Sequence, residues 1–127
     1  MGENKDYLSV VQEKGSVHIS EEVVASIAAL AANEVEGVCG LSANIGADIA
    51  ELLGYKNLGK GVKLVFDNDE ITIDCYVVAL YGYSVVDIAK NIQAKVTEAV
   101  ESMTGVKVRS VNVDICGISL PKDVKKK

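Results

Sequence analysis

Few side chains in this sequence are suited to chemistry. His18 is the only histidine, and the alternating segment around it indicates a strand or surface position. Cys39, Cys75 and Cys116 are odd in number and widely spaced, which favours buried, reduced thiols over disulfides. One histidine with scattered cysteines does not match the ligand spacing of a zinc site, and no nucleophile has a base beside it. The residues therefore predict no enzyme, no metal site and no cofactor.

Residues 54–60 match the spacing G-x-x-x-x-G-K that begins a phosphate-binding loop. The next residue is Gly61, where a serine or threonine hydroxyl would hold magnesium. The segment also lies between an expected helix and an expected strand, so no helix N-terminus follows it to hold a phosphate. We therefore expect no nucleotide site here.

A second glycine motif, Gly37-Val38-Cys39-Gly40, has the spacing G-x-x-G and is expected to form a turn between two helices. Its place in the element order resembles that of KH RNA-binding modules, in which such a loop clamps the nucleic-acid backbone. Its two central residues are apolar, glutamates precede it, and no arginine or lysine lies near it in the sequence. A structural turn is the preferred interpretation, and RNA contact by Gly37, Val38, Cys39 and Gly40 is the alternative.

The elements that would position these residues can be predicted from hydrophobic spacing. The strongest pattern is an amphipathic helix over residues 84–105, with Ser84 as N-cap and Gly105 as left-handed stop. Strand-like alternation at residues 71–80 and 106–118 predicts a βαβ unit with parallel strands. The last strand changes phase partway, which predicts a bulge near Arg109 and Ser110.

The N-terminal half contains an alanine-rich helix that ends at about Glu36 and is apolar around most of its circumference. Either it is a central core helix, or one side of it contacts another subunit through Ala25, Ala29 and Ala32. A shorter helix over residues 43–53, a strand over 62–66 and a hairpin turn at 68–69 follow.

Together these elements predict an α/β domain of the α+β type. Its expected architecture is a two-layer sandwich with element order β-α-α-β-β-α-β, in which helices pack on one mixed sheet. Residues 15–120 form the single domain, 1–14 a flexible N-terminal segment, and 121–127 a flexible basic tail. The alternative for the N-terminal segment is an edge strand formed by Tyr7, Leu8, Val10 and Val11.

The composition narrows the function classes. The chain has 127 residues, 49% of them hydrophobic, a net charge of -5 and a pI near 4.8. This charge argues against general affinity for nucleic acid or anionic lipid, since both need a basic surface. The longest nearly apolar run, residues 23–32, is too short to cross a bilayer, and residues 1–14 lack the pattern of a signal peptide. We expect a cytoplasmic protein.

Two groups of segments resemble a known family. Residues 15–20 (GSVHIS) lead into the alanine-rich helix, which ends with residues 34–38 (EVEGV). In the second half, residues 81–84 (YGYS), 100–105 (VESMTG) and 111–113 (VNV) continue the pattern. The combination is similar to the alkaline shock, or envelope stress response, proteins of Gram-positive bacteria.

That resemblance implies a non-enzymatic protein-interaction factor in cell-envelope homeostasis. Some members of the family are held at the membrane by an integral-membrane partner, and one branch is linked to acetyl-CoA carboxylase and fatty-acid synthesis. We therefore expect self-association, with an integral-membrane anchor protein or acetyl-CoA carboxylase as partner and nucleic acid disfavoured. The candidate contact residues are Ala25, Ala29 and Ala32 on the alanine-rich helix, and Tyr81 and Tyr83 in the loop before the second half's helix.

Overall fold

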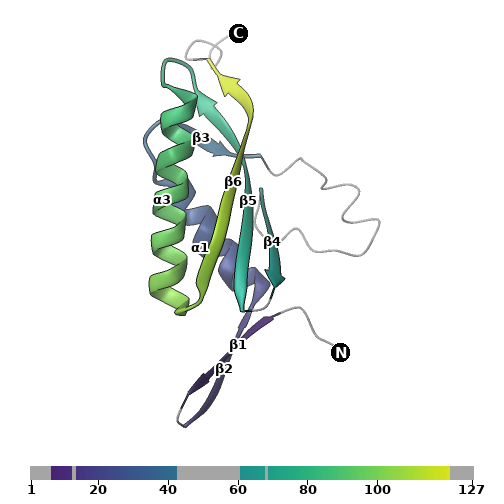
Figure 1. The fold of residues 1–127 in the computed structure, drawn as a ribbon. Helices are drawn as coiled ribbons and strands as arrows, with labels where there is room; N and C mark the ends of the chain where they lie inside the picture. The colour runs from purple at the N-terminus through teal and green to yellow at the C-terminus, as the bar shows by residue number, and fades with distance from the viewer. Residues whose placement is uncertain (1–6, 13, 43–60, 68, 121–127) are drawn as a thin grey trace, which may run out of the picture.

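The computed structural model describes residues 7–12, 14–42, 61–67 and 69–120. Six strands and two helices are described there, and Figure 1 shows both helices on the same side of the main sheet. Their bounds are β1 Tyr7–Gln12, β2 Gly15–Ser20, α1 Glu21–Asn33, β3 Val38–Leu41, β4 Val62–Asp67, β5 Glu70–Leu80, α3 Val85–Thr104 and β6 Lys107–Ser119.

Strand β5 is the centre of the main sheet. β6 pairs with one edge of β5 in parallel along its whole length. The other edge of β5 is shared, because β4 pairs antiparallel with residues 70–75 and β3 pairs antiparallel with residues 77–79. The sheet is therefore mixed, and the predicted βαβ unit of β5, α3 and β6 is confirmed.

The predicted bulge in the last strand is also confirmed. Ile71 pairs with Val108 while Thr72 pairs with Ser110, so Arg109 is the extra residue. The extra residue keeps the side chains of Val108 and Val111 on the helix side of the sheet, where both are buried. The phase change in the sequence thus has a packing cause.

The predicted element order was wrong in the first half. From β2 onward the described order is β-α-β-β-β-α-β, because residues 38–41 form β3 instead of a turn between helices. β3 forms where β5 extends beyond β4, since the exposed edge of β5 needs backbone partners there. The predicted helix over residues 43–53 lies outside the described residues, as do residues 54–60 and the tail 121–127.

The N-terminal residues also differ from the prediction. β1 pairs antiparallel with β2 from Tyr7 opposite Ser20 to Gln12 opposite Gly15. These two strands form a separate sheet that projects from the body of the molecule (Figure 1), so the described residues form two sheets and not the one predicted. Residues 7–12 are thus a paired strand within the segment predicted as flexible.

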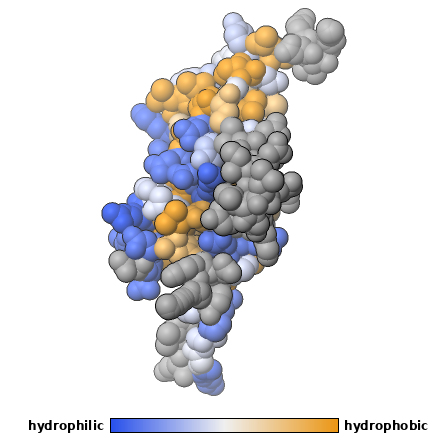
Figure 2. All heavy atoms as spheres, turned by 90° about the vertical axis from the view of Figure 1, so that its right-hand side faces the viewer, coloured by the Kyte–Doolittle hydropathy of each residue, from blue (hydrophilic) through white to orange (hydrophobic). Residues whose placement is uncertain are grey.

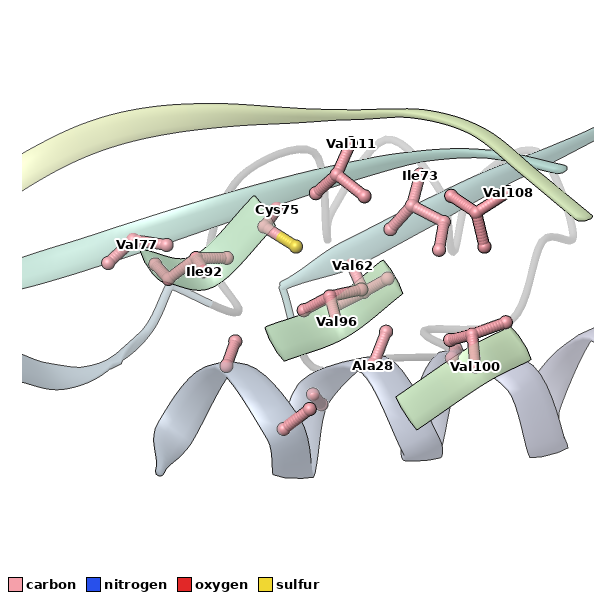
Figure 3. Close-up of a cluster of buried hydrophobic side chains, with 14 of the residues drawn as sticks. Ala28, Val62, Ile73, Cys75, Val77, Ile92, Val96, Val100, Val108 and Val111 are labelled. Carbon is pink, nitrogen blue, oxygen red and sulfur yellow. The ribbon is translucent and has the colours of Figure 1, made fainter. Parts of the chain in front are cut away.

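The core lies between the helices and the inner face of β5 and β6 (Figure 3). The spacing of α3 predicted an apolar stripe from Val85 to Met103, and its middle part is buried, whereas Val85 and Met103 themselves are 37% and 69% exposed. Each large buried side chain of the stripe gains about 1.5–3 kcal/mol from full burial. α1 contributes mostly alanines, whose small side chains let its backbone lie close to the neighbouring elements. The buried residues of α3, β5 and α1 are Ile88, Ile92, Val96, Val100 and Thr104 of α3, Ile71, Ile73, Cys75, Val77 and Ala79 of β5, and Val24, Ala25, Ala28, Ala29, Ala31 and Ala32 of α1.

Candidate partner-binding surface

The side chains that could perform chemistry are dispersed. His18 is exposed on β2, where its Nε2 lies 3.3 Å from the hydroxyl of Ser16. Within the described residues, no three His, Cys, Asp or Glu side chains are grouped so that they could hold a metal ion. Neither described helix, α1 or α3, has the length and apolar composition that a membrane span requires.

The three cysteines lie in two different environments. Cys75 is buried in β5, and burial, followed by the nearby charge of Asp74, raises the pKa of its thiol from 9.0 to about 12. Cys39 and Cys116 are free and exposed, so the prediction of buried thiols was right only for Cys75. Both exposed cysteines lie where the register shifts, and a residue in a bulge need not point into the core.

We expect a thiol reagent at pH 8 to modify Cys39 and Cys116 in the folded protein and to leave Cys75 unmodified until the protein unfolds. The thiol of Cys75 also contributes to the pH dependence of stability. Its pKa is higher in the folded state, so its contribution is present below pH 9.0 and is lost as the pH rises towards about 12. Mass spectrometry after timed labelling measures the first effect, and rapid labelling of Cys75 in folded protein would contradict it.

The G-x-x-G motif is built into the sheet. Gly37 is buried with φ +97°, and its carbonyl accepts a 2.7 Å hydrogen bond from the N–H of Leu80. Val38 and Gly40 pair with β5, and Cys39 is the residue between them. A phosphate clamp requires free backbone groups, so these internal contacts favour the structural interpretation over RNA contact.

The alanines proposed as a contact face are inside the molecule. Ala25, Ala29 and Ala32 are 0%, 8% and 0% exposed, which agrees with the core-helix interpretation of α1. Another subunit would not reach these side chains in the folded chain. The large apolar side chains that α1 exposes are Val23 and Leu30.

The loop between β5 and α3 does reach the surface. Tyr81 is 64% exposed, and its N–H donates to the carbonyl of Ser119 at 3.0 Å, which fixes the loop to the end of β6. Gly82 turns the chain with φ +104°, and the hydroxyl of Ser84 accepts a hydrogen bond from the N–H of Asp87 as the N-cap of α3. Tyr83 is also exposed, although one edge of its ring lies close to Gly37.

Four further apolar side chains surround these tyrosines. Figure 2 shows hydrophobic residues gathered at the end of the molecule where β5 and β6 end and α3 begins. We call this surface the end patch, and its exposed members are Tyr81, Tyr83, Val85, Val86, Ile118 and Leu120. The apolar spacing of the helix placed Val85 on the buried face, but the two neighbouring valines at the start of α3 cannot both face the core. That valine pair was the signal for a surface role.

The sequence matches known proteins over most of its length. Residues 9–120 match the alkaline shock protein 23 family, which has a cell envelope-related function. The Bacillus subtilis protein YqhY is 38% identical over 104 residues, which are 82% of this chain and 77% of YqhY. YloU of the same organism is 33% identical over 106 residues, 82% of this chain and 88% of YloU.

A more distant relative has a function in its name. A stress response regulator Gls24 homolog of Streptococcus pyogenes is 28% identical over 116 residues, which are 91% of this chain and 64% of that protein. All five segments that suggested the resemblance, residues 15–20, 34–38, 81–84, 100–105 and 111–113, lie inside the matched range. This chain therefore belongs to the alkaline shock protein 23 family, whose function is related to the cell envelope.

Proposed function

We propose that this protein is a non-enzymatic, cytoplasmic interaction factor of the cell-envelope stress response and that it binds a protein partner through the end patch. The observation that carries the proposal is the patch itself, six exposed apolar or aromatic side chains at one end of the fold. Exposed apolar side chains that gather at one place mark interaction sites, and tyrosine is enriched among residues that dominate binding energy.

The partner classes follow from family membership. An integral-membrane anchor protein would place this chain at the membrane, and subunits of acetyl-CoA carboxylase would connect it to fatty-acid synthesis. Self-association through the same patch is the third arrangement. All three bury apolar surface, so their affinity should depend weakly on salt, whereas binding of RNA through phosphate contacts would weaken steeply with it.

The exchange Tyr81→Ser is expected to reduce recovery of the bound partner about tenfold or more, because truncating a central aromatic side chain typically costs 1–2 kcal/mol or more of binding free energy. The thermal midpoint should change little, since Tyr81 is mostly exposed. The measurement is quantitative mass spectrometry of proteins that co-purify with the tagged chain from soluble and detergent-solubilised membrane fractions.

Leu30→Ser is the matched control, because Leu30 is an apolar side chain of α1 with a similar exposure of 66%. It should leave recovery unchanged. The proposal is wrong if Tyr81→Ser leaves recovery of the partner unchanged, or if Leu30→Ser reduces it as much as Tyr81→Ser does. It is also wrong if nuclease treatment releases everything that co-purifies.

A further inference from the structure

Strand β6 is an edge strand among the described residues, with β5 as its only partner. Side chains and backbone groups alternate along a strand, so residues whose side chains face the helices turn their N–H and C=O groups away from β5. In β6 these residues are Val108, Val111, Val113, Ile115 and Ile118. The residues between them turn their backbone groups towards β5, as the hydrogen bond from the N–H of Tyr81 to the carbonyl of Ser119 illustrates.

The first half of this outer edge is covered by side chains of α3. The Nε2 of Gln93 donates a 3.0 Å hydrogen bond to the carbonyl of Val111, and the Oε2 of Glu101 accepts one of 2.9 Å from the N–H of Val108. Occupied edge groups cannot pair with another strand, so these two side chains guard the edge from Lys107 to Val111.

The second half of the edge has no such cover from the residues that the structure describes. No side-chain hydrogen bond reaches the backbone of Val113 or Ile115 there. α3 runs opposite to β6 (Figure 1), so the residues seven and three before Gln93 lie level with this half. They are Val86, which is 59% exposed, and Lys90, whose aliphatic stem can line apolar surface.

At the level of Val113 and Ile115, helical spacing thus places Val86 and the aliphatic stem of Lys90, which we call the apolar wall, where the first half of the edge has Gln93 and Glu101. This wall is continuous with the end patch, because Val86 belongs to both. An exposed edge with an apolar wall is the arrangement that strand addition uses, in which backbone bonds provide affinity and alternate side chains provide specificity.

The charge on the face of β6 away from the helices indicates which side chains an added strand would carry there. Asp114 is exposed on the face away from the helices, and its carboxylate makes no ion pair with the described residues. Its neighbour Asn112 instead donates a 2.8 Å hydrogen bond to Asp74. A basic residue on an added strand would lie across from Asp114, and opposite charges stabilise such cross-strand pairs.

We propose that the β6 edge from Val113 to Ile118 binds an extended segment of the partner protein as an added strand, with apolar residues towards Val86 and basic residues towards Asp114. This inference rests on the proposed function, because it specifies how a partner engages the surface next to the end patch. A second copy fits less well, since its own β6 would bring another exposed Asp114 to this edge instead of a basic residue.

Hydrogen exchange measured by NMR tests the proposal. In the protein alone, the amides of Val113 and Ile115 should exchange fast, while those of Asn112 and Asp114, which face β5, should be protected. The probe is the peptide acetyl-Lys-Val-Lys-Val-Lys-Val-Lys-amide, which should slow exchange of Val113 and Ile115 about tenfold or more. The control peptide has the same charge but is N-methylated at alternate residues, so it cannot pair along its β6-facing edge.

Two variants complete the test. Val86→Gln places a guard like Gln93 beside the second half of the edge and should abolish the protection by the peptide. Leu30→Gln makes the same type of change on exposed α1 surface and should leave the protection intact. Peptide protection that survives Val86→Gln, or that the N-methylated peptide also produces, would overturn the inference, as would amides of Val113 and Ile115 already protected in the monomer.

If protection of the Val113 and Ile115 amides rises with protein concentration in the absence of peptide, a second copy is the occupant of the edge. That result would also overturn the inference. The proposed function fails separately, when Tyr81→Ser leaves partner recovery unchanged. If Tyr81→Ser removes the partner and the edge amides never respond to the peptide, only the strand-addition inference is wrong.

Discussion

Replacing Gly37 with alanine is expected to lower the free energy of unfolding by about 2–6 kcal/mol, a large fraction of the stability of a small domain. Two costs combine at this position. Its φ of +97° disfavours any residue with a Cβ, at about 1–3 kcal/mol. An added Cβ would also lie 2.9 Å from Cδ1 of Ile88 and 3.0 Å from the ring of Tyr83, and overpacking of this kind costs about 1–3 kcal/mol. Urea unfolding followed by circular dichroism measures the change.

Two other glycines separate these costs. Gly82→Ala meets only the backbone cost, since φ is +104° and nothing lies within 4 Å of the added Cβ. Gly40→Ala should have neither the backbone cost nor the packing cost, because the φ of Gly40 is not positive and its surroundings are open. The free energy of unfolding of this variant should therefore change little. If Gly37→Ala and Gly82→Ala are equally destabilising, Ile88 and Tyr83 move aside readily and the close packing at Gly37 contributes nothing.

The second half of the fold could be predicted because its signals are local and agree with one another. The helix α3 has a cap at Ser84, a left-handed stop at Gly105 and an uninterrupted apolar stripe between them. The strands on either side alternate clearly, and the change of phase near Arg109 is by itself enough to indicate the bulge. Such signals are contained in the sequence of each element.

Strand β3 could not be predicted in the same way. It spans four residues, and its valine, cysteine and leucine are interrupted by Gly40, a composition that is equally typical of a turn. What makes it a strand is the edge of β5 between Val77 and Ala79, which lies far away in the sequence. β3 therefore forms because of a pairing partner that is distant in the sequence, and the strand propensity of its own four residues does not indicate that partner.

The candidate surface shows the same limit. A row of alanines predicts that some neighbouring element lies close, but it does not say whether that element belongs to the same chain. In α1 the alanines pack against the core of the same chain. Tyr81 was predicted as a contact residue from its loop position, and the structure does place it at the surface. Gln93 and Glu101 read as ordinary solvent-facing residues of an amphipathic helix, because their bonds to β6 depend on how α3 lies against the sheet.

Replacing Ile92 with alanine is expected to lower the free energy of unfolding by about 2–5 kcal/mol. Ile92 is fully buried at the middle of α3, where Figure 3 places it beside Val77 and Cys75 of β5. Truncation removes the transfer free energy of the lost methyl and methylene groups and leaves a cavity that the surrounding sheet and α1 only partly fill. Urea unfolding should show a lower midpoint with an unchanged slope, because the surface exposed on unfolding stays nearly the same.

Met103→Ala is the matched control on the same helix, because Met103 is 69% exposed and its truncation creates no cavity. Its effect should lie within about 0.5 kcal/mol of zero at low protein concentration. A cost comparable to that of Ile92→Ala would mean that Met103 is covered in solution. In that case the penalty should grow with protein concentration if the cover is a second copy, because association stabilises the folded state by mass action.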